Sequence, residues 1–311
     1  MEENRMTTKR ILLYLLITFI ITYAVEIFLI TPMASSTDIN QAMIAQLLIS
    51  CVMFLPAIGV VLTRLFTREG FQVEGLYLAV NVKKNLKHFL LVWFGFAGLV
   101  FIGTVLYFVI FPKHFDPEMS FLQATLLAQG QPEMSSQALK STMLIQIVTG
   151  VLFAPFLNFI NCFGEEWGWR GYLLPKMLKK LKVVPTLLLT GVIWGLWHAP
   201  LTALGHNYGV GYPGFPFTGI LAMCIFCIVI GIILSYVTIK TKSCIPAVMG
   251  HGLINGVAST GIYYTSIENP YNVFLGPAPI GLIGGIGFIV LAAVLLVKMH
   301  KEEKAGTLWQ G

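Results

Sequence analysis

The sequence predicts an all-α polytopic membrane protein, a bundle of about eight transmembrane helices, and two observations carry this prediction. Apolar residues make up 56% of the 311 residues, whereas Asp, Glu, Lys and Arg together make up only 11%. Soluble globular proteins carry roughly 25% charged residues. The apolar residues also gather in segments of about 20 residues, the length that crosses a bilayer as a helix. Because eight such segments leave only short loops, we expect one membrane-embedded unit without a large soluble domain.

Eight apolar segments follow one another along the chain. They cover residues 11–29, 44–63, 89–111, 143–163, 184–204, 217–238, 244–264 and 278–297. The first is too long and too bulky at its end for a cleaved signal peptide, so we expect it to be a retained helix. Between the third and fourth segments, the apolar stretch 121–127 predicts a short helix that lies at the membrane surface. The loop 205–216 is rich in Gly, Pro and Tyr, which predicts irregular structure.

The basic residues indicate the orientation in the membrane. If the eight segments cross in alternation, all of the 20 Lys and Arg residues except Lys113 and Lys140 fall on one side. Loops rich in Lys and Arg stay on the cytoplasmic side, so we expect both termini to be cytoplasmic. We expect a multi-pass integral protein of a prokaryotic plasma membrane, because the chain has no eukaryotic sorting signal. The lipid bilayer is an expected partner and nucleic acid is not, since no basic cluster carries interleaved aromatic residues.

The end of the fourth segment carries an unusual set of polar residues for membrane depth, where ionisable groups are costly. On a helix, Asn158, Asn161 and Glu165 share one face. Glu166 and Arg170 are four residues apart, in the order that favours an ion pair. Adjacent carboxylates point about 100° apart on a helix. We therefore expect Arg170 to hold Glu166 while Glu165 faces a cavity; the alternative is a pair of charges at the membrane surface.

Two more segments carry histidines. His198 lies in the fifth segment, and His251 and Asn255 share one helical face in the seventh. Each could be a packing residue or an interhelical hydrogen-bonding group. At 1.5 Å per residue, however, Glu165 and both histidines lie roughly 10–20 Å from the cytoplasmic edge. We therefore expect them to meet in one cavity that is open to the cytoplasmic side, with the catalytic core in spans 4, 5 and 7.

A carboxylate and two imidazoles in one cavity can act as a general base and orient a water molecule for nucleophilic attack. His and Asn donors can stabilise the oxyanion of a tetrahedral intermediate. Alternatively, Glu165, His198 and His251 could hold Zn²⁺, whose bound water becomes the nucleophile. Both routes hydrolyse an amide. The sequence has no His-Glu-x-x-His, and its only aspartates, Asp38 and Asp116, fall in loops. These absences exclude the protease class built on that zinc motif and the paired-aspartate intramembrane proteases.

Three motifs in this order carry a family resemblance. They are Glu165-Glu166-x-x-x-Arg170, Trp194-x-x-x-His198 and His251-x-x-x-Asn255. The pattern resembles that of the CPBP family, which comprises CAAX proteases and bacteriocin-processing enzymes and is also called the Abi family of intramembrane proteases. The resemblance covers about residues 142–264. The second motif of the family usually opens with Phe, and Trp194 keeps an aromatic side chain there.

The resemblance implies a role for each site residue. It makes Glu165 the general base with help from His198, makes His251 and Asn255 the oxyanion hole, and makes Glu166 and Arg170 supporting residues. The family is named as a metalloprotease family, so Zn²⁺ bound by Glu165, His198 and His251 remains open beside a metal-free glutamate mechanism. The implied organisation is an N-terminal part of three transmembrane helices (1–140), a CPBP-like catalytic core (141–266), and a last transmembrane helix with a cytoplasmic tail (267–311).

The implied function is that of an intramembrane endopeptidase of the CAAX-processing or bacteriocin-processing type. Its expected substrate is a peptide or a lipidated protein C-terminus. The alternative is a non-catalytic membrane immunity or scaffold protein of the same fold. A third reading, an ion-coupled transporter, is disfavoured because the sequence has no internal repeat.

Overall fold

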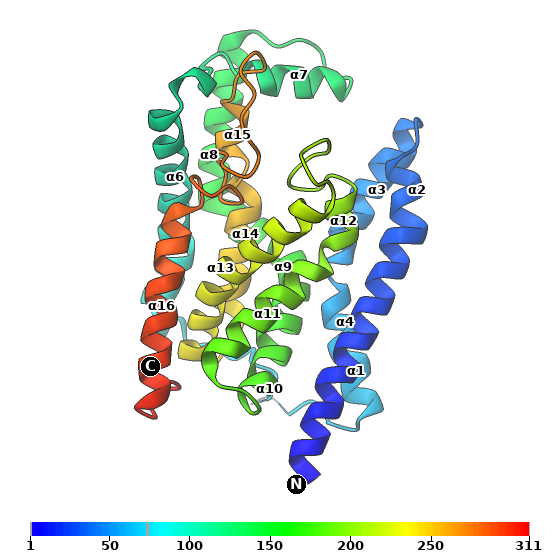
Figure 1. Cartoon of the computed structure of the whole chain (residues 1–311), viewed down its shortest axis with the longest axis vertical. Helices are drawn as coiled ribbons and strands as arrows, with labels where there is room; N and C mark the ends of the chain where they lie inside the picture. Colours follow the sequence, from blue (N-terminus) through cyan, green and yellow to red (C-terminus); the bar gives the residue numbers. More distant parts are fainter. Residues whose placement is uncertain (1, 73–74, 311) are drawn as a thin grey trace.

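The computed structural model describes residues 2–72 and 75–310 of the chain. Over these residues the regular structure is helical, without a β-strand, apart from one bridge between Phe115 and Thr265. Most of the long helices run along the long axis of the molecule, and both termini lie at the same end (Figure 1). The all-α prediction is therefore confirmed.

Each of the eight apolar segments has a helical counterpart. The N-terminal half contains α1 (Glu2–Val25), α2 (Thr31–Ala34), α3 (Ile39–Val52), α4 (Leu55–Phe66), α5 (Val82–Leu90), α6 (Phe96–Ile110), α7 (Ser120–Ala128) and α8 (Ser136–Leu157). The C-terminal half contains α9 (Phe159–Glu166), α10 (Leu174–Leu178), α11 (Val183–Trp197), α12 (Ala199–Ala203), α13 (Phe217–Thr241), α14 (Ile245–Val257), α15 (Thr260–Tyr263) and α16 (Ile286–Lys304). Short π-helical segments, η1 (Glu26–Ile30), η3 (Leu91–Gly95) and η5 (Trp167–Leu173), continue α1, α5 and α9, and η4 (Pro112–His114) is a 3₁₀ turn.

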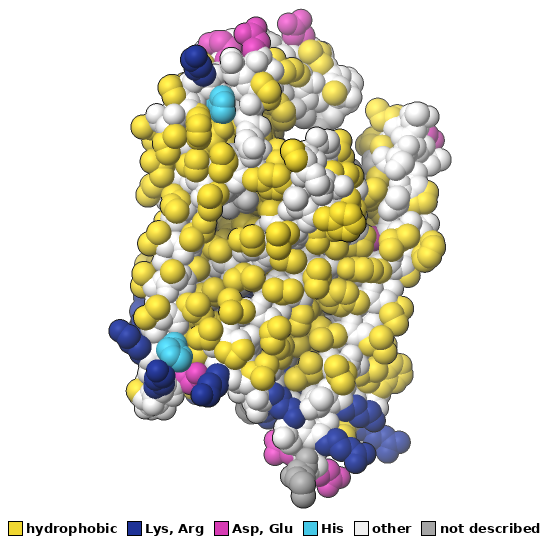
Figure 2. All heavy atoms as spheres, viewed as in Figure 1, with side chains coloured by type: hydrophobic (Ala, Val, Ile, Leu, Met, Phe, Trp, Pro, Cys, Tyr) yellow, Lys and Arg dark blue, Asp and Glu magenta, His cyan; other side chains and the backbone are white. Residues whose placement is uncertain are grey.

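Several helices are suited to a bilayer. Among the described residues, four helical stretches are individually long and apolar enough to cross a membrane, namely Glu2–Ala34, Val82–Ile110, Ser136–Leu157 and Phe217–Thr241. Helices α3 and α4, which are bent by 45° at a short break, make a fifth if they are counted as one span. Hydrophobic side chains cover the middle of the molecule, and Lys and Arg side chains gather at the end that carries the termini (Figure 2). The protein is thus an integral membrane protein; the count of eight spans stays a prediction.

Prolines interrupt the helices that carry the site. Helix α8 ends at Leu157, two residues after Pro155, and Asn158 separates it from α9. Likewise His198 separates α11 from α12, two residues before Pro200. Proline lacks a backbone N–H and its ring clashes with the preceding turn, so a helix bends or breaks there. The breaks shorten the individual helices and place His198 at a bend in the middle of the bundle.

Two glycines let α11 approach α13 closely. A Cβ atom on Gly191 would lie 2.5 Å from the Cα of Ile228, and one on Gly195 would lie 2.4 Å from the Cα of Cys224. Small residues permit such backbone-to-backbone packing in membrane helices. The contact fixes the position of α11, and therefore of the site residues at its end, against α13.

Three predicted segments can be compared directly with the structure. The helix expected at 121–127 is present as α7, whereas its place at the membrane surface stays a prediction. The loop 205–216 has no long helix, as predicted. The eighth segment was expected from residue 278, but α16 begins only at Ile286. Pro277, Pro279 and the glycines that follow disfavour a helix there.

Candidate active site

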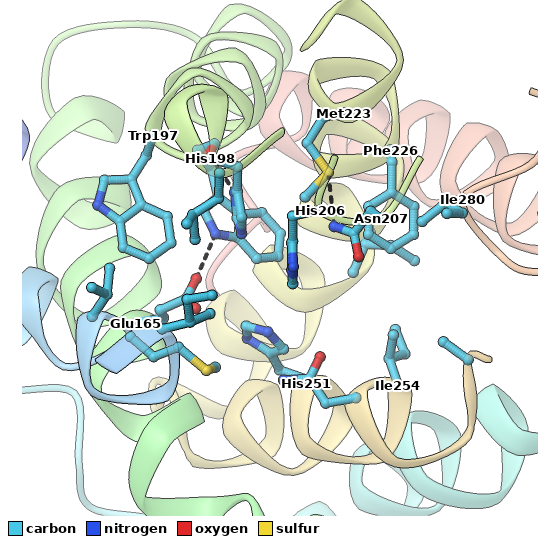
Figure 3. Close-up of a pocket in the computed structure, with 18 of the residues that line it drawn as sticks. Glu165, Trp197, His198, His206, Asn207, Met223, Phe226, His251, Ile254 and Ile280 are labelled. Carbon is cyan, nitrogen blue, oxygen red and sulfur yellow. Dashed lines mark hydrogen bonds between the residues drawn. The ribbon is translucent and has the colours of Figure 1, made fainter. Parts of the chain in front are cut away.

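The structure brings the principal site residues into one cavity. A cavity of about 370 Å³ is lined by Glu165 from α9, His198 from the α11–α12 break, and His251 and Asn255 from α14. Glu165, His198 and His251 come from separate helices and surround the same space (Figure 3). Residues from the fourth, fifth and seventh apolar segments therefore meet at this point.

Glu165 is held in a defined position. Its side chain is 1% exposed, and its Oε2 accepts a hydrogen bond from the indole Nε1 of Trp194 at 2.7 Å (Figure 3). The same indole ring packs against His251, with ring centroids 5.4 Å apart at 70°. Trp194 stands where the family usually has Phe, so the residue that departs from the motif supplies a donor that a phenyl ring lacks.

Glu166 connects two helices through one oxygen atom. Its Oε1 accepts from Nη1 of Arg170 at 3.0 Å, which is the ion pair expected from their spacing. The same Oε1 lies 2.9 Å from Nδ1 of His251, a contact that the spacing could not predict because it joins α9 to α14. Glu166 is 0% exposed and Arg170 is 3% exposed. The guanidinium carbon also lies 4.1 Å from the ring centroid of Trp194, close enough for a cation–π interaction.

The ring of His198 is oriented by a contact within its own helix, and the bend that carries His198 is attached to α1. Its Nδ1 lies 2.9 Å from the carbonyl oxygen of Trp194. A carbonyl can only accept, so we assign the proton to Nδ1, which leaves a lone pair on Nε2. The adjacent Trp197 donates from its indole to Oγ1 of Thr22 at 2.9 Å, which ties this bend to α1.

The asparagines occupy different environments. Asn255 is exposed to the cavity, and its Nδ2 makes only a weak contact, at 3.6 Å, with the sulfur of Cys162. Asn158 and Asn161 were expected on the same face as Glu165, but neither lines the cavity. The helix breaks at Asn158, which changes the shared face, and Asn158 instead donates to the carbonyl of Gly252 in α14 at 3.0 Å.

The donor atoms as placed do not form a metal-binding set. Within residues 2–72 and 75–310, no group of three or more His, Cys, Asp or Glu side chains is arranged to hold a metal ion. Glu165 is bonded through Oε2 to Trp194, and the Nδ1 atoms of both histidines are engaged with protein oxygens. These hydrogen bonds leave Oε1 of Glu165 and Nε2 of each histidine as possible donor atoms, so Zn²⁺ binding by Glu165, His198 and His251 stays a prediction.

Several polar residues of the cavity were not identified from the sequence. His206 and Asn207, on the irregular loop 205–216, line the same cavity (Figure 3). Gln46 and Ser50 line it from α3. In the sequence, His206 and Asn207 are distinguished only by their position shortly after the helix break near Pro200. Helix α3 carries no sequence motif that links Gln46 or Ser50 to the site.

The cavity extends away from the end of the bundle that carries the termini. Asn255 in α14 and Ser259 just after the end of α14 follow His251 in steps of four residues, and both line the cavity. In the opposite direction from Glu165 lie Glu166 and Arg170, which are buried. The side of the membrane to which the cavity opens stays a prediction.

Comparison with known proteins gives a match to one family model and a similarity to one curated protein. Residues 142–257 match the family described as type II CAAX prenyl endopeptidase Rce1-like. CAAX prenyl protease 2 of Methanococcus maripaludis is 32% identical over 108 residues, which are 32% of this chain and 37% of that protein. The chain therefore spans little more than a third of the length of this curated relative in the alignment.

The matched region holds all three motifs and every residue that the motifs contribute to the cavity. Its first motif supplies Glu165, its second His198, and its third His251 and Asn255. These matches and the three motifs show that residues 142–257 are similar to the Rce1-like type II CAAX prenyl endopeptidases, in agreement with the CPBP resemblance of the motifs.

Proposed function

We propose that the protein is an intramembrane endopeptidase of the CAAX-processing or bacteriocin-processing type. The observation that carries this proposal is a buried carboxylate, Glu165, in a cavity that His198, His251 and Asn255 also line. A carboxylate shielded from bulk solvent and beside imidazole nitrogens is suited to general-base activation of water. The similarity to a CAAX prenyl protease supports the same reaction class.

In the proposed first step, a water molecule lies between Glu165 and Nε2 of His198. Glu165 removes a proton from this water while the lone pair on Nε2 orients it. The resulting hydroxide adds to the carbonyl carbon of the scissile peptide bond, and the π electrons of the carbonyl move to its oxygen. The indole of Trp194, which donates to Oε2 of Glu165 at 2.7 Å, keeps the carboxylate in position for this transfer.

The tetrahedral oxyanion needs hydrogen-bond donors. Asn255 can supply its Nδ2, since its present contact with Cys162 is weak. His251 can supply Nε2 when the ring carries both protons, because Nδ1 already faces Oε1 of Glu166. The proton taken up by Glu165 then passes to the amide nitrogen, the C–N bond breaks, and the products are a carboxylic acid and an amine.

We propose that this mechanism operates without a metal ligated by Glu165, His198 and His251. The placement of the side chains supports the proposal, because no three His, Cys, Asp or Glu side chains within residues 2–72 and 75–310 are arranged around one point as a bound Zn²⁺ would require. The proposed substrate is a peptide or a lipidated protein C-terminus. The rival proposal, an immunity or scaffold protein that only binds, gives no reason for a buried carboxylate and two imidazoles around one cavity.

The test is cleavage by the detergent-purified protein. A panel of farnesylated CAAX peptides and unmodified membrane peptides should contain a substrate that the wild type cleaves and the Glu165→Gln variant does not. Glu118→Gln is the matched control, since Glu118 is an exposed glutamate on the far loop and should keep full activity. If wild type and Glu165→Gln cleave at the same rate, or if the wild type cleaves no member of the panel while binding one, the catalytic proposal fails.

A further inference from the structure

The two ends of the bundle differ in charge. Both termini lie at one end, where Lys and Arg side chains gather (Figures 1 and 2). On the sequence-predicted topology, all of the 20 Lys and Arg residues except Lys113 and Lys140 belong to this end. Such an imbalance marks the cytoplasmic side of a membrane protein. The end that carries α7 is then the non-cytoplasmic end.

The site is closed toward the end that carries the termini. The chain that follows Glu165 forms η5 and α10, and its side chains fill the space on that side. Exposed fractions are 0% for Glu166, 1% for Trp169, 3% for Arg170, 1% for Tyr172 and 0% for Leu173. Close packing of this kind leaves no room for a peptide. A substrate cannot reach Glu165 along this direction without displacing a layer of large buried side chains.

The opposite side of Glu165 is open and polar. Six polar side chains that line the cavity are exposed, namely Gln46, Ser50, His206, Asn207, Asn255 and Ser259. The direction of the helices places them. Helix α14 starts close to Lys242 and runs through His251 to Val257, with Ser259 just beyond its end, and the loop with His206 follows the far end of α12. Exposed polar groups at membrane depth line water-filled space rather than lipid. The hydrated part of the cavity therefore begins at Glu165 and leads away from the termini.

We infer that the catalytic cavity is entered from the non-cytoplasmic side of the membrane. Its substrate is then a polypeptide whose scissile bond is presented in the non-cytoplasmic half, such as a translocated peptide or an outward-facing membrane segment. A lipidated C-terminus in the cytoplasmic leaflet does not meet this requirement. Cleavage of such a substrate rests on the proposed function, whereas the side of entry follows from the cavity and the charge distribution alone.

Cysteine labelling measures the side of entry without requiring activity. Cys51 is exposed and the other four cysteines are buried, so the Cys51→Ser variant has no exposed cysteine to react with the label. Into it we place Ser259→Cys, in the mouth of the cavity, or Lys301→Cys, an exposed position near the C-terminus. Intact spheroplasts are treated with a membrane-impermeant maleimide before or after permeabilisation. Gln46→Cys, on the opposite wall of the mouth, repeats the experiment should Ser259→Cys fail to fold.

The inference expects Ser259→Cys to be labelled in intact spheroplasts and Lys301→Cys to be labelled only after permeabilisation. Three results overturn it. Labelling of Lys301→Cys from outside means that the orientation is inverted. Labelling of Ser259→Cys and Gln46→Cys only after permeabilisation places the mouth on the cytoplasmic side. Labelling of neither position under any condition, in folded protein, means that the mouth is closed.

A second measurement separates access from catalysis. A cleavable peptide is added outside either right-side-out or inverted membrane vesicles, and the cleavage rate is compared. The inference predicts cleavage by right-side-out vesicles at least tenfold faster than by inverted ones. Faster cleavage by inverted vesicles would overturn the inference and leave the proposed peptidase function intact. Labelling of Ser259→Cys from outside, without cleavage of the peptide by either kind of vesicle, would support the side of entry and count against the proposed peptidase function.

Discussion

Nδ1 of His251 lies 2.9 Å from Oε1 of Glu166, the same oxygen that accepts from Arg170. This contact joins α14 to the end of α9 and fixes the orientation of the His251 ring. The neighbouring Glu165 bonds instead to Trp194 and faces the cavity. Two adjacent carboxylates thus have separate surroundings, one within a charged cluster and the other beside the open space where a substrate would lie.

Replacement of Glu166 by Gln should destabilise the fold. The variant leaves Arg170 and His251 without their shared carboxylate in a site that is almost fully buried. Loss of one partner of a buried ion pair costs about 3–5 kcal/mol. We expect a clear decrease in the melting temperature of the purified protein, with a parallel loss of activity. An unchanged melting temperature would show that this cluster does not stabilise the bundle.

Trp194→Phe isolates the hydrogen bond to Glu165. The phenyl ring keeps the packing against His251 and Arg170 but removes the indole donor. A hydrogen bond to a charged group contributes about 1.5–3 kcal/mol, so we expect kcat to fall about tenfold or more with little change in KM, and the melting temperature to fall less than in Glu166→Gln. Trp309→Phe, in the C-terminal tail, is the control and should leave kcat unchanged. Equal kcat values for wild type and Trp194→Phe would remove the donor from the mechanism.

Removal of divalent metals should leave the activity intact. The proposed mechanism routes the proton through Glu165 and uses no metal ligated by His198 or His251. Dialysis of the purified protein against EDTA and 1,10-phenanthroline is expected to retain the cleavage rate within twofold, and added Zn²⁺ should not increase it. Loss of activity on dialysis that is restored by stoichiometric Zn²⁺ would instead support the metal alternative.

The carboxylate of Glu69 should make stability depend on pH at the end that carries the termini. Glu69 lies in the loop after α4 and accepts from Lys176 at 2.6 Å and from Tyr172 at 2.8 Å. Burial raises the pKa of Glu69, but the hydrogen bonds and the charge of Lys176 outweigh it, so the net pKa lies below the usual 4.5. A lowered native pKa means stabilisation that is present above pH 4.5 and is lost as the pH falls through the native pKa.

We therefore expect the melting temperature of the wild type to fall more steeply below pH 4.5 than that of Glu69→Gln, which lacks the titrating group. Above pH 4.5 the wild type should be the more stable of the two. Parallel curves for the two proteins would show that Glu69 contributes no pH-dependent stability.

Much of the architecture follows from local sequence patterns, because a helix in a membrane must satisfy its own backbone hydrogen bonds. Helix α7 and the ion pair of Glu166 with Arg170 depend on short spacings and were predictable. The contact of Glu166 with His251 spans 85 residues and depends on packing between helices. His206 and Gln46 also reach the cavity only through tertiary structure. The direction in which the cavity opens depends on which side chains fill the space around Glu165. Counting residues along a helix gives only the depth of Glu165 in the membrane and cannot predict this direction.

The most direct test of the account compares Glu165→Gln with Glu166→Gln for cleavage rate and melting temperature. Glu165→Gln can still accept from Trp194 but cannot take up a proton. It should lose about 10²–10⁴ in rate, as expected for a general base, and keep the wild-type melting temperature. Glu166→Gln should melt at a lower temperature. An active Glu165→Gln beside a stable but inactive Glu166→Gln would contradict the account and exchange the roles of the two carboxylates.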